Sequence, residues 1–385
     1  MKRWIQYTKK ICMLAFCAIV IPCGYEALEN KLWPHEEAVE GIVPDQYIIK
    51  KQGIMLADVD TIVPENNLAG AASSDQEGSK TRVIRAAGAS AGSQAVGPGA
   101  EYSPVMTVSQ PITGYLGGSK ITLLANQSIS QMLSVLIETN QGKIIMVDGG
   151  TPEDTTHLVQ TLAAKGSHVD AWLITHPHSD HIGALNEILN HPEYGITVDN
   201  FYFSFTGLSW YQEYEPGRAD MVEKIMTSLA MQPQEKVHGD IYRGQEIVVD
   251  NVKITVMNLP YLQTTNSINN SSVAYKLDIN GKKAVFLGDM GVETGREFLA
   301  DHTPEELKCD IVQMAHHGQA GVGLEVYKAL QPEICLWGAP EWLWNNDSGS
   351  GMDSGIWKTI ETRRWMAQLG VPYHVCIKDG DQVIQ

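Results

Sequence analysis

Three histidines and one aspartate lie within six residues near the middle of this chain. They follow directly on the apolar run 171–174 and form the pattern His176-x-His178-x-Asp180-His181. Imidazoles and a carboxylate this close together would each need a hydrogen-bond partner if buried, and charged rings would repel one another. Neutral imidazole nitrogen and carboxylate oxygen are ligands that zinc and similar divalent cations prefer. The pattern therefore predicts a metal site at the end of a buried strand.

Residues 1–27 have the charge pattern of an export signal. Basic residues lie within the first ten positions, an apolar stretch from Ile11 to about Tyr25 follows, and the acidic Glu26 and Glu29 come next. This asymmetry is typical of a segment whose positive end stays in the cytoplasm. A cleaved signal peptide and a retained membrane anchor both stay open, because no small-x-small cleavage site follows. We expect the protein to be exported, either extracellular or anchored to the outer face of the cytoplasmic membrane.

Residues 28–107 lack the composition of a large folded domain, although the short apolar pieces within 30–68 leave a small accessory structure open. From Ala69 to Pro104 the chain is rich in Gly, Ala and Ser. Such a segment buries too little apolar surface to offset the entropy lost on ordering. We therefore expect a low-complexity, largely flexible linker at 28–107 and a single folded domain at 108–385.

Acidic residues outnumber basic ones in this chain. The 28 Lys and Arg residues and 45 Asp and Glu residues give a formal net charge of −17. A nucleic acid bound through its phosphates needs a basic surface, so this balance argues against such a partner. Small-molecule and cell-envelope substrates stay open, and we expect membrane contact only through the amino-terminal segment. The six cysteines are too few and too scattered for a disulfide framework.

Strand and helix patterns alternate from about residue 120 onward. Strands are expected at 121–124, 134–139 and 143–147, and a later strand pair turns at Asn280-Gly281. Helices are expected to begin at Pro152, at about Gly183 and at about Gly355. Two similar halves of this kind indicate two sheets packed face to face with helices outside.

Four motifs occur in the order and spacing of the metallo-β-lactamase-fold hydrolases. They are Asp148-Gly149-Gly150, the segment His176–His181, Gly288-Asp289 and His316-His317-Gly318. The resemblance covers about residues 115–385. Within that superfamily, the His-His-Gly ending and the segment Asn269–Val273 resemble the hydrolase domain of competence ComEC proteins, and bacterial phosphorylcholine esterases look similar. The resemblance implies an α+β fold, a four-layer αβ/βα sandwich with a two-metal site at one edge of its sheets.

Six residues are the expected metal ligands. His176 and His178 alternate along the chain and can face one cation, whereas Asp180 and His181 can reach a second. Asp289 ends an apolar strand and can bridge both cations, although a helix cap near Gly291 is the alternative. His317 is the sixth expected ligand. We expect two divalent ions, with zinc favoured and manganese as the alternative.

Three further residues are expected beside the ligands. His316 should contact the substrate or the leaving group, and the reverse assignment of His316 and His317 stays open. Asp148 should orient a ligand histidine, since metal-bound imidazoles usually donate their other N–H to a carboxylate or carbonyl. Many members of the superfamily carry a third histidine on the first metal, and here Asn269 and Asn270 occupy its approximate place. Asn270 is therefore expected in the shell around the ligands.

The expected chemistry is hydrolysis by a metal-activated water that Asp180 orients. The leading interpretation is a metal-dependent hydrolase of phosphoester or phosphodiester substrates at the cell surface. A hydrolase of carboxylic esters, lactones or β-lactams is the first alternative. The second is a surface binding protein on a degenerate hydrolase fold. The missing third histidine favours this second alternative slightly, whereas the presence of both Asp180 and Asp289 argues against it.

Overall fold

The computed structural model describes residues 105–108 and 110–385. The predicted export segment, 1–27, lies outside the described residues, as does nearly all of the predicted linker. Within the described part of the chain, no helix has both the length and the apolar character needed to cross a membrane. Val105, at the start of this part, is buried, and its carbonyl accepts a hydrogen bond from Arg363 Nη2 at 3.2 Å.

One seven-stranded sheet has the order β16–β1–β2–β3–β5–β7–β8. Its strands are antiparallel from β16 to β3 and parallel from β3 to β8. The bounds are Lys120–Leu123 for β1, Ser134–Glu138 for β2, Ile144–Asp148 for β3, Ala171–Leu173 for β5, Phe201–Tyr202 for β7, Val237–His238 for β8 and Gln382–Ile384 for β16.

A second seven-stranded sheet has the order β15–β14–β13–β12–β11–β10–β9. It is antiparallel from β9 to β12 and parallel from β12 to β15. The β11–β12 hairpin turns at Asn280 and Gly281, which both have positive φ as a two-residue turn of this kind requires. The bounds are Glu246–Val249 for β9, Val252–Val256 for β10, Tyr275–Ile279 for β11, Lys282–Phe286 for β12, Ile311–Gln313 for β13, Ile334–Trp337 for β14 and Tyr373–Cys376 for β15.

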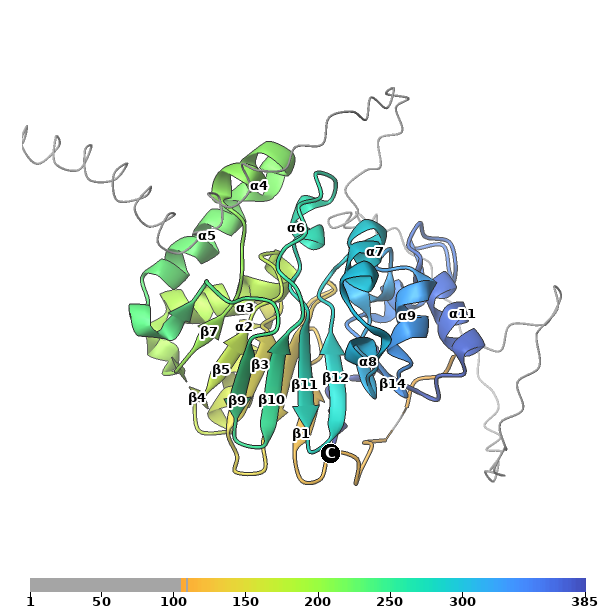
Figure 1. The fold of residues 1–385 in the computed structure, drawn as a ribbon, viewed down its shortest axis with the longest axis horizontal. Coiled ribbons are helices and arrows are strands. Elements are labelled where there is room, and N and C mark those ends of the chain that lie inside the picture. Colours follow the sequence, from red (N-terminus) through yellow and green to blue (C-terminus); the bar gives the residue numbers. More distant parts are fainter. Residues whose placement is uncertain (1–104, 109) are drawn as a thin grey trace, which may run out of the picture. The chain divides into compact units, whose positions relative to one another are not determined.

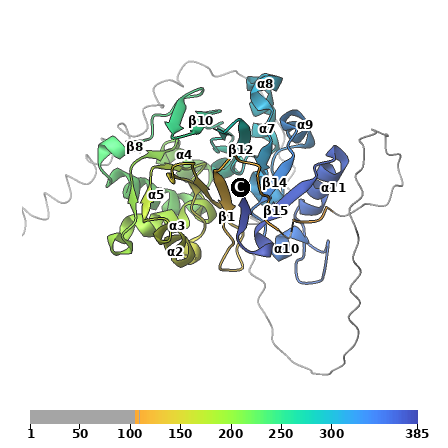
Figure 2. The same cartoon turned by 90° about the horizontal axis from the view of Figure 1, so that it is seen from below.

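The helices lie on the two outer sides of the strands. Figure 1 and the turned view in Figure 2 both show α2, α3 and α5 on one side and α7, α9 and α11 on the other. Two short strands, β4 (His168–Val169) and β6 (Thr197–Val198), form a separate two-stranded sheet. The helix bounds are Thr155–Ala163 for α2, Ser179–Asn190 for α3, Leu208–Tyr214 for α4, Ala219–Ala230 for α5, Ser267–Asn270 for α6, Val292–Asp301 for α7, Pro304–Leu307 for α8, Leu324–Leu330 for α9, Glu341–Trp344 for α10 and Thr359–Leu369 for α11.

Alternation along the strands of the second sheet separates two hydrophobic cores. In β12, Ala284 and Phe286 belong to the core that the second sheet shares with the first. Val285, between them, belongs to the core under α7 and α9, together with Phe298 and Val326. Successive side chains of a strand point to opposite faces, so this sheet is covered on both sides. The structure confirms the predicted α+β fold with its αβ/βα layering.

Two predicted helix starts are wrong. Helix α3 begins at Ser179 and not near Gly183, because the amides of His181 and Ile182 already donate to the His178 carbonyl, at 3.0 and 2.9 Å. Gly183 serves close packing instead, since a Cβ there would lie 2.3 Å from Pro152 Cδ. Helix α11 begins at Thr359, four residues after the predicted start at Gly355.

The arrangement of strands brings the four sequence motifs to one edge. Asp148 is the last residue of β3, and His176 follows the neighbouring parallel strand β5. In the second sheet, Asp289 follows β12, and His317 follows the neighbouring parallel strand β13. Parallel neighbours end at the same edge of a sheet, and the two sheets stack, so these side chains meet.

Candidate metal centre

The His-rich segment changes conformation at His178. Residue 178 has an extended backbone, with φ −77° and ψ 149°, and caps α3. Asp180 and His181 lie in the first turn of that helix, not on a loop. Acidic side chains are favoured in a first turn because the helix amides there carry partial positive charge. One short segment thus sends two imidazoles from extended chain and two further ligand side chains from a helix into the same space.

The first group of potential ligands consists of His176, His178 and Asp289. One ligand atom from each lies within 4.8 Å of the others. His176 Nε2 lies 3.2 Å from His178 Nδ1 and 3.8 Å from Asp289 Oδ2. All three residues are buried. The other ring nitrogens contact residues outside this group: His176 Nδ1 contacts Thr175 Oγ1, and His178 Nε2 contacts Glu215 Oε1. His176 Nε2 and His178 Nδ1 are therefore the nitrogens that face the group.

The second group consists of Asp180, His181, Asp289 and His317, again with ligand atoms within 4.8 Å of one another. His317 Nε2 lies 3.0 Å from Asp180 Oδ2, 3.3 Å from Asp289 Oδ2 and 3.2 Å from His181 Nε2. The distance from His181 Nε2 to Asp289 Oδ1 is 3.2 Å. Asp180 has the most exposed side chain of the group, at 16%, so it is the member that solvent reaches most easily.

Asp289 belongs to both groups and lies between them. Both of its carboxylate oxygens are buried, and their neighbours in the described part of the chain are the imidazole nitrogens of His176, His181 and His317, at 3.8, 3.2 and 3.3 Å. Its amide is held by Ser272 Oγ at 2.9 Å, so the side chain is presented from a fixed backbone. The cap of α7 is Gly291, so the helix-capping alternative does not account for Asp289. Buried anionic oxygens surrounded by imidazole nitrogens fit a divalent cation on each side.

Charges in the metal-free cluster compensate one another. Burial opposes the charged form of His317, but the carboxylates of Asp289 and Asp180 outweigh it and raise the pKa of this imidazole to about 9. For His181 burial is again outweighed, by Asp289 and Asp148, and its pKa is raised well above the usual value. Burial and the neighbouring His181 hold the pKa of His176 well below the usual value. The cluster therefore carries protons that an incoming cation must displace.

Asp148 contacts His181, a member of the second group of potential ligands, on the side of the ring away from that group. Its Oδ2 lies 2.7 Å from His181 Nδ1, and its two oxygens also accept hydrogen bonds from the amide and hydroxyl of Thr175, at 2.8 and 2.7 Å. Burial raises the pKa of Asp148, and these donors counteract the increase. With its hydrogen on Nδ1, His181 keeps the lone pair of Nε2 for a cation.

Replacement of Asp148 by Asn should lower the affinity for divalent cations by about 10- to 100-fold. The new amide can donate to His181 Nδ1, which moves the imidazole hydrogen to the metal-facing Nε2. Asn tolerates the positive φ of 54° at this position, so backbone strain does not contribute to the measured change in affinity. Titration of the metal-free variant with zinc, followed by calorimetry, measures the change. Unchanged affinity would show that Asp148 does not orient the ring.

The adjacent His316 and His317 point in different directions. Both have positive φ, 51° and 55°, in the turn that follows β13. His317 enters the second ligand group, and its Nδ1 lies against Gly338, where a Cβ would come within 2.8 Å. The Nε2 of His316 instead lies 3.2 Å from Asn269 Nδ2. His317 is therefore a member of the cluster, whereas His316 lies beside it, with 6.2 Å between the centres of the two rings.

Asn270 holds the chain that leaves Asp289. Its Oδ1 accepts hydrogen bonds from the Gly291 amide and the Thr294 hydroxyl, both at 2.9 Å, and its Nδ2 donates to the Thr265 carbonyl. These contacts fix the start of α7. The side chain that reaches a histidine from this segment is that of the preceding residue, Asn269.

Glu215 contacts one histidine of the cluster, although nothing in the sequence indicates this contact. Its Oε1 lies 3.4 Å from His178 Nε2, the ring nitrogen turned away from the ligand group. Its Oε2 accepts hydrogen bonds from Ser267 Oγ and the Ile268 amide, both at 2.9 Å. Burial opposes ionisation, but His178 and these donors outweigh it and lower the pKa of Glu215. No spacing signals such a contact, because Glu215 lies 37 residues from His178 in a segment that stands out only for its aromatic residues.

Replacement of Glu215 by Ala should weaken cation binding on the His176/His178 side by about 10-fold, because the His178 ring loses the acceptor that orients it. Glu215→Gln should retain most of the affinity, since an amide oxygen can still accept from Nε2. Calorimetric titration of both variants with zinc measures the difference. Equal losses in the Ala and Gln variants would contradict this orienting role.

Two glutamines also support the cluster and had no sequence signal. Gln131 Nε2 donates to Asp180 Oδ2 at 3.3 Å, and Gln319 Nε2 donates to Gln131 Oε1 at 2.9 Å. Both glutamines are buried. These two linked side-chain amides limit the rotation of the Asp180 carboxylate.

The layers and the two ligand groups define a class of protein, an α+β sandwich with a candidate two-ion metal centre at the edge of its sheets. The profile of the Metallo-beta-lactamase superfamily matches residues 130–333, more than half of the chain. The chain belongs to the metallo-beta-lactamase superfamily, and the resemblance seen in its motifs is confirmed.

The relatives found share only part of their length with this chain. ComE operon protein 3 of Bacillus subtilis (strain 168) is 25% identical over 182 residues, 46% of this chain and 21% of that protein. The probable metallo-hydrolase YflN of the same organism is 23% identical over 105 residues, 26% of this chain and 39% of that protein. This chain thus spans a fifth to two fifths of these relatives. Among solved structures, the metallo-beta-lactamase fold protein YhfI from Bacillus subtilis is 13% identical, with a TM-score of 0.44 over 69% of this chain and 98% of that chain.

Proposed function

We propose that this chain is a hydrolase that uses two divalent ions to cleave phosphoester or phosphodiester bonds. The observation that carries the proposal is the position of Asp289, whose buried carboxylate belongs to both ligand groups and is surrounded by imidazole nitrogens. A carboxylate shared in this way suits two neighbouring cations, and two-ion sites can clamp the attacking and the leaving oxygen of a phosphoryl group. Zinc is the favoured metal because imidazole nitrogens dominate the ligand set.

The metal ions, when bound, lower the pKa of water and stabilise the negative charge that develops on the attacked group. Asp180 is the least buried ligand, and Gln131 fixes one of its oxygens, so the other can orient the attacking water and accept its hydrogen bond. Asp148 and Glu215 hold His181 and His178 in the tautomers that face the cations. We assign His316, whose ring lies next to the cluster, to contact with the substrate or its leaving group.

A hydrolase of carboxylic esters, lactones or β-lactams is the competing enzymatic function. The phosphoester assignment is preferred because the His316-His317-Gly318 ending resembles the phosphodiesterase-like branch of the superfamily, and because the two ligand groups share one carboxylate. A binding protein without activity is disfavoured, since a scaffold gains nothing from retaining Asp180 and Asp289.

An activity panel on the metal-loaded full chain tests this function. The panel contains a generic phosphodiester, a phosphomonoester, a lactone and a β-lactam, and bound metal is measured on the same samples. We expect phosphodiester or phosphomonoester hydrolysis that Asp180→Ala reduces on the order of 10³-fold. Activity confined to the lactone or β-lactam would refute the substrate class. Activity indifferent to Asp180→Ala would refute the catalytic role of the centre.

We also propose that the chain acts outside the cytoplasm on a small-molecule or cell-envelope substrate. The support is the basic and then apolar pattern of residues 1–27 and the net charge of −17, which disfavours nucleic acid. Fractionation of cells that produce the full chain should find it in the membrane or the medium. Recovery in the cytoplasm alone would refute export.

A further inference from the structure

The two sides of the candidate centre are unequal. The side of Asp180, His181 and His317 offers four ligand residues when the shared Asp289 is counted, whereas the other side offers three. In the described part of the chain, no further His, Cys, Asp or Glu joins the group of His176 and His178. Glu215 faces the far nitrogen of His178 and so is not a donor to this side.

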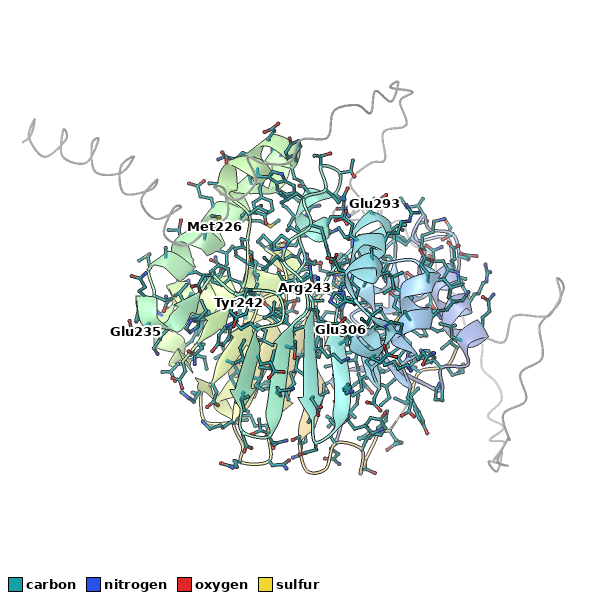
Figure 3. The ribbon with its side chains drawn as sticks, in the orientation of Figure 1. Met226, Glu235, Tyr242, Arg243, Glu293 and Glu306 are labelled. Carbon is teal, nitrogen blue, oxygen red and sulfur yellow. The ribbon has the colours of Figure 1, made fainter. Side chains whose placement is uncertain are left out.

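Helix α6 and the residues after it are anchored to the immediate neighbours of all three donors on this side. The start of α6 binds Glu215, the partner of His178. Ser272 Oγ accepts the amide of Asp289 at 2.9 Å, and the amide of Val273 donates to the carbonyl of Thr175, which precedes His176, also at 2.9 Å. Figure 1 shows α6 beyond the ends of the strands, and Glu293, in the first turn of α7, lies toward the same end of the domain in Figure 3. These anchors hold the α6 segment against the three-donor side.

Asn269 of this segment carries a carboxamide oxygen without a partner. The side chain is fully buried. Both hydrogens of its Nδ2 are engaged, one by Asn266 Oδ1 at 3.0 Å and one by His316 Nε2 at 3.2 Å. The orientation of the amide follows from these two acceptors, and Oδ1 must point the other way. That oxygen is buried and has no hydrogen-bond partner in the described part of the chain.

We propose that the Asn269 carboxamide oxygen is the missing protein ligand on the His176/His178 side of the centre. The inference rests on the proposed two-ion centre and adds a residue type that was not among the expected ligands. A buried amide oxygen loses free energy unless it meets a donor or a cation, and carboxamide oxygens are accepted metal ligands. A neutral, hard oxygen in place of a third imidazole shifts the preference of this side toward harder ions such as Mn²⁺ relative to zinc.

Metal binding by the full chain tests this assignment without substrate. The metal-free wild type and the Asn269→Leu, Asn269→Asp and Asn269→His variants are titrated with Mn²⁺, followed by electron paramagnetic resonance, and with zinc, followed by calorimetry. Asn190→Leu, in the last turn of α3, is the control away from the cluster, because within the described residues the Asn190 amide bonds to Asn186 and Ser228 and to no residue of the cluster. Thermal unfolding checks that each variant is folded.

We expect Asn269→Leu to lose at least about 100-fold in affinity for one of two Mn²⁺ ions and to keep the other. Asn269→Asp should keep both ions, Asn269→His should raise the zinc-to-manganese affinity ratio, and the control should match the wild type. Wild-type affinities in Asn269→Leu would overturn the inference. If that variant unfolds, equal zinc-to-manganese ratios in the wild type and the Asp and His variants would overturn it.

Failure of the proposed phosphoester hydrolysis and failure of the Asn269 assignment give different results in these experiments. A wild type that binds two ions, loses one in Asn269→Leu and hydrolyses no phosphoester refutes the substrate class but supports the ligand assignment. A wild type that binds fewer than two ions overturns both.

Discussion

Replacement of Asp289 by Asn should reduce the bound metal from two ions to at most one per chain and lower hydrolysis on the order of 10³-fold or more. The wild-type carboxylate belongs to both ligand groups, and both of its oxygens are buried among the imidazoles of the cluster. An amide in its place offers one neutral oxygen and turns an NH2 group toward the imidazoles. Metal analysis of the purified chain and the phosphodiester assay measure the two effects.

The matched control for this variant is Asp301→Asn. Asp301 ends α7, the helix that follows Asp289, and its side chain is 44% exposed beside Arg243. We expect this variant to keep wild-type metal content and activity. If Asp289→Asn retained two ions, the bridging assignment would be wrong even if activity were lost.

Cation affinity should increase steeply with pH, by at least about 100-fold between pH 7 and pH 9. In the metal-free chain the pKa of His317 is about 9, since Asp289 and Asp180 outweigh the effect of burial. A cation must displace that proton from the imidazole, so each pH unit below 9 costs about a factor of ten in apparent affinity. His181, whose pKa is also raised, adds a second proton and steepens the dependence. Calorimetric titrations with zinc across this pH range, in buffers of different ionisation enthalpy, give both the affinity and the number of protons released.

The same shift sets the sign of the pH dependence of the metal-free fold. The folded-state pKa of His317 lies above the ordinary value of 6.5, so its stabilising contribution is complete below pH 6.5 and is lost as the pH rises through about 9. Thermal unfolding of the metal-free chain should therefore occur at lower temperature at pH 9 than at pH 6.5. A cation affinity that is flat from pH 7 to pH 9, with no proton release, would refute the charged state of this cluster.

Much of the fold could be predicted from the sequence because its signals are local. Apolar strands that end in Asp148 or run just before Asp289, and the turn at Asn280-Gly281, mark sheet edges and hairpins within a few residues. The start of α3 differs from the prediction because the second half of the ligand-rich segment, Asp180 and His181, lies in the helix and not on a loop. In the structure the carbonyl of His178 already accepts helical hydrogen bonds, and a glycine that suggested a helix start is required by the close packing of α3 against Pro152.

Partners that act over long sequence separations had no signal of their own. Gln131 reaches Asp180 across 49 residues and Asn269 reaches His316 across 47. Gln131 has no motif around it. Asn269 opens the segment Asn269–Val273, but nothing in that segment indicates a contact with His316. Only the approach of two sheets and a short helix brings each residue to the cluster. Asn270 was expected near the ligands, whereas its contacts hold the start of α7.

By itself the sequence determined the kinds of donor and the strand ends that present them, because ligand chemistry and strand termination are properties of adjacent residues. It also identified the superfamily, because four motifs occur in the order typical of its members. The tertiary structure alone decided that Asp289 lies between two groups, and that His317 rather than its neighbour His316 joins one of them. These choices depend on side-chain directions, which follow from backbone angles at strand ends and from the packing of two sheets. Neither is encoded within the few residues of a motif.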